Sequence, residues 1–339
     1  MPLVSVLMLV NKDIPINYFS EAMQGILNQT LSDFELIIID GGLKGEAKDL
    51  LLTNAVRDPR IHIIAETTKG LCANRNLSMS LAIGKYCAIA DADDVYLPDR
   101  LEKEVKFLEN NPYISLIGSS IRTIGQTPEV TLDFPQEHAW IYCKLFLCNA
   151  FAHSTVMWRR EDIVNSKIFY RLDACEDYDF FIQLSDKIRM ANLDDVLVGY
   201  RVYSSQISQV GLEKKYWNLK QIYKDQILKL GLAPNEDEID LLVKINESNF
   251  DNSIIFFKRV RSFFTKLKNA NQTRKIYPEP EFCKVLAECF WQIFKRVKLN
   301  IRSFTLFLIT PFLWIILLNL LTKRINKFSK FINQILQSI

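Results

Sequence analysis

The chain has 339 residues, of which 49% are hydrophobic and 24% are charged, with only 11 glycines and 11 prolines. These proportions exclude a disordered, collagen-like or low-complexity chain and leave one large or two modest folded domains. The formal net charge of +3 hides an asymmetry, because residues 258–339 carry +13 and residues 1–257 carry −10. An acidic front part joined to a basic tail indicates attraction to an anionic partner, either nucleic acid or membrane.

Short β-rich runs alternate with helical patterns through the first 120 residues. Strands are expected at 3–10, 36–39, 61–65, 86–90 and 114–117, and helices at 19–27, 46–56, 71–82 and 98–108. This order predicts an α/β fold, a mostly parallel sheet with helices on both faces. Ligands of such sheets bind beyond the carboxyl ends of the strands, which selects Asn11, Asp40 and Asp91.

The second half of the chain has a different character. Residues 120–210 alternate less regularly, and residues 213–300 are typical of helices and loops with a break at 277–280. Residues 303–321 contain no charge over 19 positions, about the length that crosses a bilayer, and basic residues flank both ends. A single span and an in-plane insertion against anionic headgroups both fit this segment, and a buried core helix is the alternative. Nucleic acid requires no such segment, so a membrane is the expected partner.

Cysteines and histidines give little sign of a metal or disulfide framework. The seven cysteines are irregularly spaced without a C-x-x-C pair, which predicts reduced thiols and a cytosolic setting. The three histidines lie far apart and form no H-x-x-x-H pattern. The first residues lack the basic start and cleavage site of a secretory signal and instead predict a strand. Any metal would therefore bind carboxylates.

The sharpest candidate for such a site is Asp91-Ala92-Asp93-Asp94. Alternate residues of an extended chain point the same way, so Asp91 and Asp93 could share Mg²⁺ or Mn²⁺ through hard oxygen ligands. Such a cation would neutralise the charge that builds on a diphosphate leaving group. A solvated acidic turn explains the spacing equally well.

A second acidic group lies at residues 175–181, directly before an apolar helical stretch. One carboxylate there could act as a general base toward an acceptor hydroxyl. The alternative is that Glu176 and Asp177 only cap the first helical turn and interact with its dipole.

Several motifs together resemble the family 2 glycosyltransferases. They are Val4-Ser5-Val6-Leu7-Met8, Gln29-Thr30 with 34–40, Arg75-Asn76, Ala82-Ile83-Gly84-Lys85-Tyr86, Asp91-Ala92-Asp93-Asp94, Pro98-Asp99-Arg100-Leu101 and Glu176-Asp177. Their order and spacing are similar to those of the GT-A-fold enzymes that extend bacterial surface polysaccharides. The resemblance covers about residues 2–210, and its combined motifs are specific although each alone is weak.

The resemblance implies a role for individual residues. Those implied on the donor side are Val10, Asn11, Asp40, Arg75, Asp91 and Ala92, with Asp40 binding the nucleotide base. Asp93 is the implied metal ligand, with Asp91 as a second ligand or a ribose contact. Asp177 matches the catalytic base, and His153 and Glu176 match the acceptor side.

Two departures from the family pattern concern the nucleotide end. The common D-D-G-S after the second strand is Asp40-Gly41-Gly42-Leu43 here, so one carboxylate and one hydroxyl are missing. Tyr203 stands where a histidine often ends the Y-R-x-H element, which removes a possible phosphate or metal contact. These changes affect the identity of the donor more than the reaction itself.

We therefore expect an inverting, metal-dependent glycosyltransferase that moves a sugar from a uridine diphosphate sugar to a hydroxyl of a lipid-linked saccharide in cell-surface polysaccharide biosynthesis. The expected organisation is a catalytic domain at 1–212, a helical basic extension at 213–302 and a membrane-associating segment with a basic tail at 303–339. The chain would act at the cytoplasmic face of the inner membrane, either peripherally or with a single span, and without a nucleic-acid partner.

Two other classes of protein were compared with this expectation. A membrane-docked nucleotide-sugar-binding scaffold without turnover is favoured by Gly41 and Tyr203, whereas retention of Asp93 and Asp177 speaks against it. A sugar nucleotidyltransferase needs a glycine-rich loop after the first strand to bind a triphosphate, and residues 11–15 contain no glycine.

Overall fold

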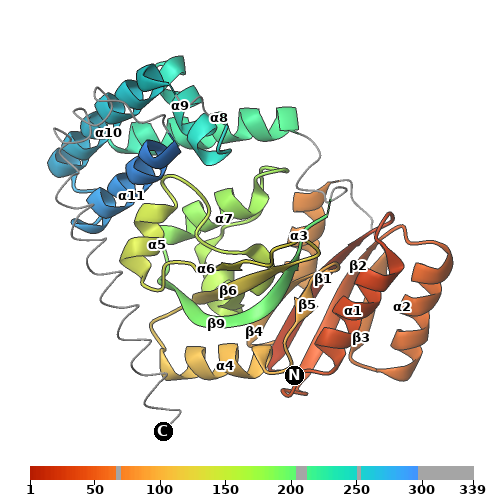
Figure 1. The fold of residues 1–339 in the computed structure, drawn as a ribbon. Coiled ribbons are helices and arrows are strands. Elements are labelled where there is room, and N and C mark those ends of the chain that lie inside the picture. The colour runs from red at the N-terminus through yellow and green to blue at the C-terminus, as the bar shows by residue number, and fades with distance from the viewer. Residues whose placement is uncertain (66–69, 204–211, 250–252, 297–339) are drawn as a thin grey trace, which may run out of the picture. The chain divides into compact units, whose positions relative to one another are not determined.

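The computed structural model describes residues 1–65, 70–203, 212–249 and 253–296, and within these ranges nine strands form one sheet in the N-terminal unit, Met1–Leu219 (Figure 1). The strands are β1 (Val4–Asn11), β2 (Phe34–Gly41), β3 (Ile61–Ala65), β4 (Tyr86–Asp91), β5 (Val95–Tyr96), β6 (Leu116–Ile124), β7 (Thr131–Leu132), β8 (Met157–Arg159) and β9 (Met190–Arg201). Their order in the sheet is β3-β2-β1-β4-β8-β6-β9-β5, with β7 paired to β6.

The predicted α/β fold is confirmed, and the first four strands pair in parallel as expected. The later strands make the sheet mixed, because β8 runs antiparallel to β4 and β6, and β5 runs antiparallel to β9. Strand β2 shows why the parallel half could be read from the sequence. Its residues from Phe34 to Asp40 are all buried, and a strand covered on both faces appears as a continuous apolar run.

Helices cover both faces of this sheet. They are α1 (Ile16–Leu27), α2 (Gly45–Arg57), α3 (Leu71–Leu81), α4 (Arg100–Asn110), α5 (His138–Lys144), α6 (Arg160–Ser166) and α7 (Glu176–Ser185), with a 3₁₀ turn η1 (His153–Thr155). Val6 of β1 and Phe19 of α1 share one buried core with Met157 of β8. The next residue, Trp158, instead contacts Phe180 of α7, with ring centroids 6.1 Å apart. Because neighbours in a strand point to opposite faces, α1 and α7 lie on opposite sides of the sheet.

A buried network explains the glycine that precedes β4. The Gly84 amide donates to the Ser5 hydroxyl at 2.8 Å, and the Ser5 hydroxyl donates to Glu35. A Cβ atom at Gly84 would lie 2.6 Å from the Ser5 nitrogen, so only glycine allows the chain to approach β1 this closely. This contact sets where β4 begins, and therefore where Asp91 ends it.

The C-terminal unit begins at Lys220, and its described part is helical. The helices of this region are α8 (Leu212–Lys229), α9 (Glu236–Asn246), α10 (Ile254–Arg274) and α11 (Glu281–Arg296). Phe257 of α10 stacks on Phe290 of α11 with ring centroids 4.5 Å apart. The predicted break at 277–280 is confirmed, because it separates α10 from α11.

No helix within the described ranges is both long and apolar enough to cross a bilayer. The segment 303–321, for which the sequence predicts membrane association, lies outside the described residues.

Candidate active site

The carboxyl ends of β2 and β4 flank that of β1, which brings the first predicted carboxylates to one edge of the sheet. Strand pairing sets Val10 beside Asp40 and Leu9 beside Asp91. Asp91 is the last residue of β4, and the chain then turns through Asp93 into β5. Thus Val10, Asp40 and Asp91 occupy the edge where parallel strands of α/β proteins bind ligands.

Arg75 of α3 forms the central ion pair of this edge. Its Nη2 donates to Asp91 Oδ1 at 2.8 Å, and the guanidinium is buried. Burial is the largest single effect and would raise the pKa of Asp91, but the charge of Arg75, its hydrogen bond and weaker neighbouring contributions together hold that pKa below its ordinary value. The Nε and Nη1 atoms of Arg75 are buried and find no acceptor among the described residues. Buried donors are nearly always satisfied, so these two N–H groups indicate a place for an acceptor-rich ligand.

His153 of η1 joins Arg75 and Asp91 from a third element. Its Nδ1 lies 4.0 Å from Asp91 Oδ1, and its Nε2 lies 3.0 Å from the Tyr170 hydroxyl. Burial, followed by the Arg75 charge, lowers the pKa of His153 to about 3 despite the opposing effect of Asp91. The imidazole is therefore neutral at physiological pH and serves as a hydrogen-bonding group.

The other two carboxylates of the turn differ from Asp91. Burial and the neighbouring Asp91 charge raise the pKa of Asp93, while the Tyr203 hydroxyl, 2.8 Å from Asp93 Oδ2, lowers it. Burial together with Asp91 and Asp93 raises the pKa of Asp94 well above its ordinary value, and its Oδ1 accepts the Arg201 amide at 2.8 Å. Asp94 thus holds the turn to the end of β9, and Asp91 and Asp93 remain the candidate ligands.

Asp177 lies in the first turn of α7 and is fixed at both oxygens. Asn149 Nδ2 donates to Oδ2 at 2.8 Å, and the Tyr178 amide donates to Oδ1 at 2.7 Å. Burial raises the pKa of Asp177 and so does Asp91, whereas the Tyr178 amide and Arg75 lower it. A carboxylate with a raised pKa and fixed geometry is suited to accept a proton from a substrate.

Electrostatic coupling links the two acidic groups that lie far apart in sequence. Burial raises the pKa of the Tyr200 phenol, and the charges of Asp94, Asp91, Asp93 and Asp177 raise it further, so this one phenol lies within electrostatic range of both acidic groups. Burial and Asp177 raise the pKa of Glu176 to about 7, and Arg75 opposes that shift. The fold therefore brings Arg75, the turn of residues 91–94 (the Asp turn) and the start of α7 into one cluster.

The nucleotide end of the predicted site is organised differently. Asp40 is buried, and although burial opposes its ionisation, the Lys48 ammonium and the amides of Leu43 and Gly42 lower its pKa. Asn11 is exposed, and its side chain accepts the Asp13 amide at 3.2 Å. Ala92 is buried beside Asp91. Asp40 is thus an ionised carboxylate anchored by the chain that directly follows it, residues 42–48.

Sequence reasoning missed the supporting partners Lys48, Asn149 and Tyr170. Tyr170 accepts an Asn76 side-chain N–H at its carbonyl, donates its amide to the same side chain, and stacks on Phe180 at 4.2 Å. Asn76 follows Arg75 in the R-N element, so the asparagine of that motif could have indicated that another segment, here the one with Tyr170, is bonded beside Arg75. No comparable signal marks Asn149.

The fit of a divalent cation rests on the Asp91 and Asp93 pair. Within the ranges that the structure describes, no group of three or more His, Cys, Asp or Glu side chains is arranged to hold a metal. The two carboxylates nevertheless lie close enough for the charge of Asp91 to raise the pKa of Asp93. A cation bound there would relieve this repulsion, and hard oxygen ligands suit Mg²⁺ and Mn²⁺, which complete their coordination with water and phosphate oxygens.

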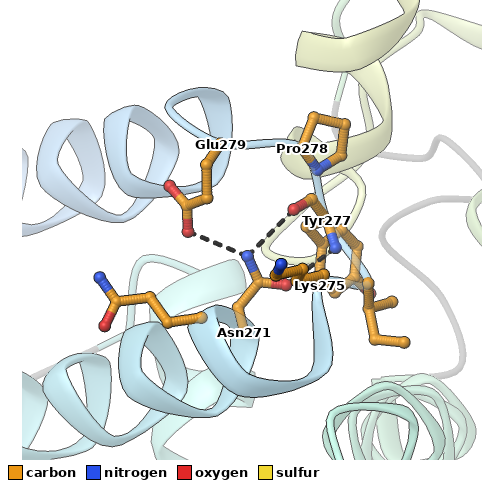
Figure 2. Close-up of a pocket in the computed structure, with 7 residues that line it drawn as sticks. Asn271, Lys275, Tyr277, Pro278 and Glu279 are labelled. Carbon is orange, nitrogen blue, oxygen red and sulfur yellow. Dashed lines mark hydrogen bonds between the residues drawn. The ribbon is translucent and has the colours of Figure 1, made fainter.

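A separate pocket of about 440 Å³ lies in the C-terminal unit. It is lined by Asn271, Gln272, Lys275, Ile276, Tyr277, Pro278 and Glu279. Figure 2 shows the Asn271 amide group bonded to the Tyr277 carbonyl and to Glu279, while its oxygen accepts the Tyr277 amide. The polar groups of Asn271 are therefore used to hold the turn between α10 and α11, and this pocket offers no comparable group of catalytic side chains.

The family that known proteins assign to this chain is matched within the N-terminal unit, which contains the candidate site. Residues 7–169 match the family described as glycosyl transferase family 2. An uncharacterized glycosyltransferase of Methanocaldococcus jannaschii is 32% identical over 236 residues, covering 66% of this chain and 81% of that protein. The O-antigen biosynthesis glycosyltransferase WbnJ of Escherichia coli is 32% identical over 222 residues, covering 62% of this chain and 86% of that protein. The chain belongs to the family 2 glycosyltransferases.

Two solved structures share the fold at low sequence identity. S. aureus TarS 1-349 in complex with UDP-GlcNAc matches with a TM-score of 0.52 and 14% identity, covering 87% of this chain and 81% of that chain. The mannosyltransferase PcManGT from Pyrobaculum calidifontis, in complex with GDP-Man and Mn²⁺, matches with a TM-score of 0.50 and 14% identity, covering 94% and 86%. At this identity the likeness concerns the fold alone.

Proposed function

We propose that this enzyme transfers a sugar, with inversion, from a uridine diphosphate sugar to a hydroxyl of a lipid-linked saccharide. The observation that carries the proposal is Asp177, a carboxylate held by Asn149 and the Tyr178 amide within electrostatic reach of Arg75 and Asp91. This arrangement supplies a base and a cationic group in one cluster, which is what a displacement at an anomeric carbon requires.

In the proposed reaction, the acceptor oxygen forms its bond to the anomeric carbon as its proton passes to Asp177. The bond from that carbon to the diphosphate oxygen breaks on the opposite face, and the electron pair leaves with the nucleotide diphosphate. A single displacement of this kind inverts the configuration. The two N–H groups of Arg75 without an acceptor would donate to the diphosphate, and neutral His153 would keep Tyr170 in place on the acceptor side.

We assign the metal to Asp93 and Asp91. A bound Mn²⁺ or Mg²⁺ would supply neutralisation of the charge on the departing diphosphate. The complex of PcManGT with Mn²⁺ supports this assignment at the level of the shared fold. On the donor side we assign Val10, Asn11, Asp40 and Ala92 to the nucleotide, and the TarS complex with UDP-GlcNAc supports a uridine nucleotide. Glu176 is assigned to the acceptor side.

The acceptor and location are proposed from the relatives and from the tail. The name of WbnJ places that relative in O-antigen biosynthesis, which supports a role for this chain in surface polysaccharide biosynthesis. We propose that 1–212 is the catalytic domain, that 213–302 is a basic helical extension, and that 303–339 docks at anionic lipids of the cytoplasmic membrane face, peripherally or as a single span.

Nucleotide release tests this function directly. The purified full chain, incubated with individual UDP sugars and Mn²⁺, is expected to release UDP from at least one of them as water takes the place of the acceptor hydroxyl, and chelation of the metal should stop the release. UDP is measured with a coupled enzyme assay, and donor binding is measured in parallel by thermal shift. If donors raise the melting temperature but no UDP is released from any of them, the chain is a nucleotide-sugar-binding scaffold and the proposal is wrong.

A further inference from the structure

The last residue of β9, Arg201, and the second residue after it, Tyr203, contact the Asp turn. The Arg201 amide donates to Asp94 Oδ1 at 2.8 Å, and Arg201 Nε donates to the Asp93 carbonyl at 2.8 Å. The Tyr203 hydroxyl donates to Asp93 Oδ2, also at 2.8 Å. The backbone and the side chain of Asp93 are therefore both held by a segment more than 100 positions further along the chain.

Tyr203 is itself held in place by α1. Its ring meets the ring of Tyr18 edge-on, with centroids 5.2 Å apart. The Arg201 guanidinium lies over the other ring of this pair, 4.1 Å from the Tyr18 centroid, and also bonds to Glu21. The phenol is thus supported by packing and aims its hydroxyl at one oxygen of Asp93.

The hydrogen bond from the Tyr203 hydroxyl has a clear physical consequence for Asp93. The Tyr203 hydroxyl donates to Oδ2 at 2.8 Å, so it fixes the direction in which the Asp93 carboxylate points and stabilises the charged form that a cation binds. A carboxylate has about four acceptor sites on its two oxygens, so one hydrogen bond to Oδ2 leaves Oδ1 and a further lone pair for a cation. Groups that orient a ligating carboxylate in this way affect metal affinity strongly, with losses of roughly 10–100-fold when they are removed.

We propose that Tyr203 is a positioning residue that orients the Asp93 carboxylate for the divalent cation through its hydroxyl group. This inference rests on the proposed function, since it takes Asp93 to be a metal ligand. It also gives the Tyr203 departure a different meaning: the tyrosine acts on the cation through Asp93, where the sequence alone suggests only a lost contact.

A measurement of Mn²⁺ affinity distinguishes a role of the Tyr203 hydroxyl from a role of its ring in packing. The full chain is titrated with Mn²⁺ in the presence of excess UDP, and the free ion is followed by electron paramagnetic resonance. Tyr203→Phe keeps the ring and removes the hydroxyl, and it is expected to weaken Mn²⁺ binding by about tenfold or more. Tyr18→Phe removes a hydroxyl from the other ring of the same pair and should change the affinity by less than about twofold, because the hydroxyl that bonds to Asp93 Oδ2 belongs to Tyr203.

Asp93→Asn distinguishes failure of the inference from failure of the proposed function. If Asp93→Asn abolishes binding while both phenylalanine variants bind like the wild type, Asp93 is a ligand and the role of Tyr203 is refuted. If both phenylalanine variants weaken binding equally, ring packing accounts for the effect and the hydroxyl role is again refuted. If the wild type does not bind Mn²⁺, or Asp93→Asn binds it unchanged, the metal assignment itself is wrong and the inference falls with it.

Discussion

Replacing Asp177 with asparagine is expected to reduce sugar transfer by roughly 10²–10⁴-fold, the contribution of a positioned general base. Asparagine has nearly the same shape and its side-chain oxygen can still accept the Asn149 N–H, but it cannot take the acceptor proton. Donor binding should persist, because no assigned donor contact involves Asp177. The turnover rate is measured with saturating donor and acceptor, and the donor dissociation constant is measured by calorimetry.

Asp186→Asn at the other end of α7 is the matched control. Asp186 is exposed and accepts the Tyr142 hydroxyl, so this variant should turn over like the wild type. The pH profile adds a second readout. Because burial and then Asp91 raise the pKa of Asp177, the rate should fall as pH drops through a value above the usual range of an aspartate. The residual activity of Asp177→Asn should lack this decline, and an unchanged profile would show that another group is the base.

Replacing Arg75 with methionine is expected to destabilise the N-terminal unit by about 3–5 kcal/mol, since it leaves the Asp91 charge without its partner. The variant should also lose most donor affinity, because the two free N–H groups disappear with the guanidinium. Hydrogen exchange of the β4 amides, followed by mass spectrometry, reports stability in this unit. Donor affinity is measured by calorimetry.

A second substitution separates the structural from the functional role of Arg75. Adding Asp91→Asn to Arg75→Met removes the unpaired charge, so the double variant should regain part of the lost stability but none of the donor affinity. Arg122→Met, at an exposed position of β6, should change stability by less than about 0.5 kcal/mol. Recovery of donor binding in the double variant would contradict the assignment of Arg75 to the diphosphate.

How far the sequence could predict the fold depends on whether each strand carries its own signal. Strands β1, β2 and β4 are largely buried on both faces and read as apolar runs, so their order and the position of Asp91 could be predicted. Strand β9 could not be predicted in this way. Its middle residues are partly or fully exposed and include Asp194 and Asp195, and it is defined by its long pairing with β6.

In the candidate site too, residues within a motif could be predicted, whereas their contacts with residues far along the chain could not. Asp91, Asp93 and Asp177 could be named from motif spacing, because the family pattern keeps the reacting groups at recognisable positions. Their partners could not, since Asn149 reaches Asp177 across 28 positions and Tyr203 reaches Asp93 across 110. Such contacts depend on how β9 and α7 pack after folding. The Y-R-x-H element marks position 203 but not its partner, and no motif marks Asn149.

The configuration of the product during the first turnover tests the central claim most directly. If one carboxylate removes the acceptor proton while the diphosphate leaves from the opposite face, an α-linked donor must give a β-linked product. Proton NMR of the reaction with a UDP sugar and a saccharide acceptor reports this through the coupling constant of the anomeric proton. We predict inversion in every product molecule, and a product that keeps the configuration of the donor would contradict direct displacement assisted by Asp177.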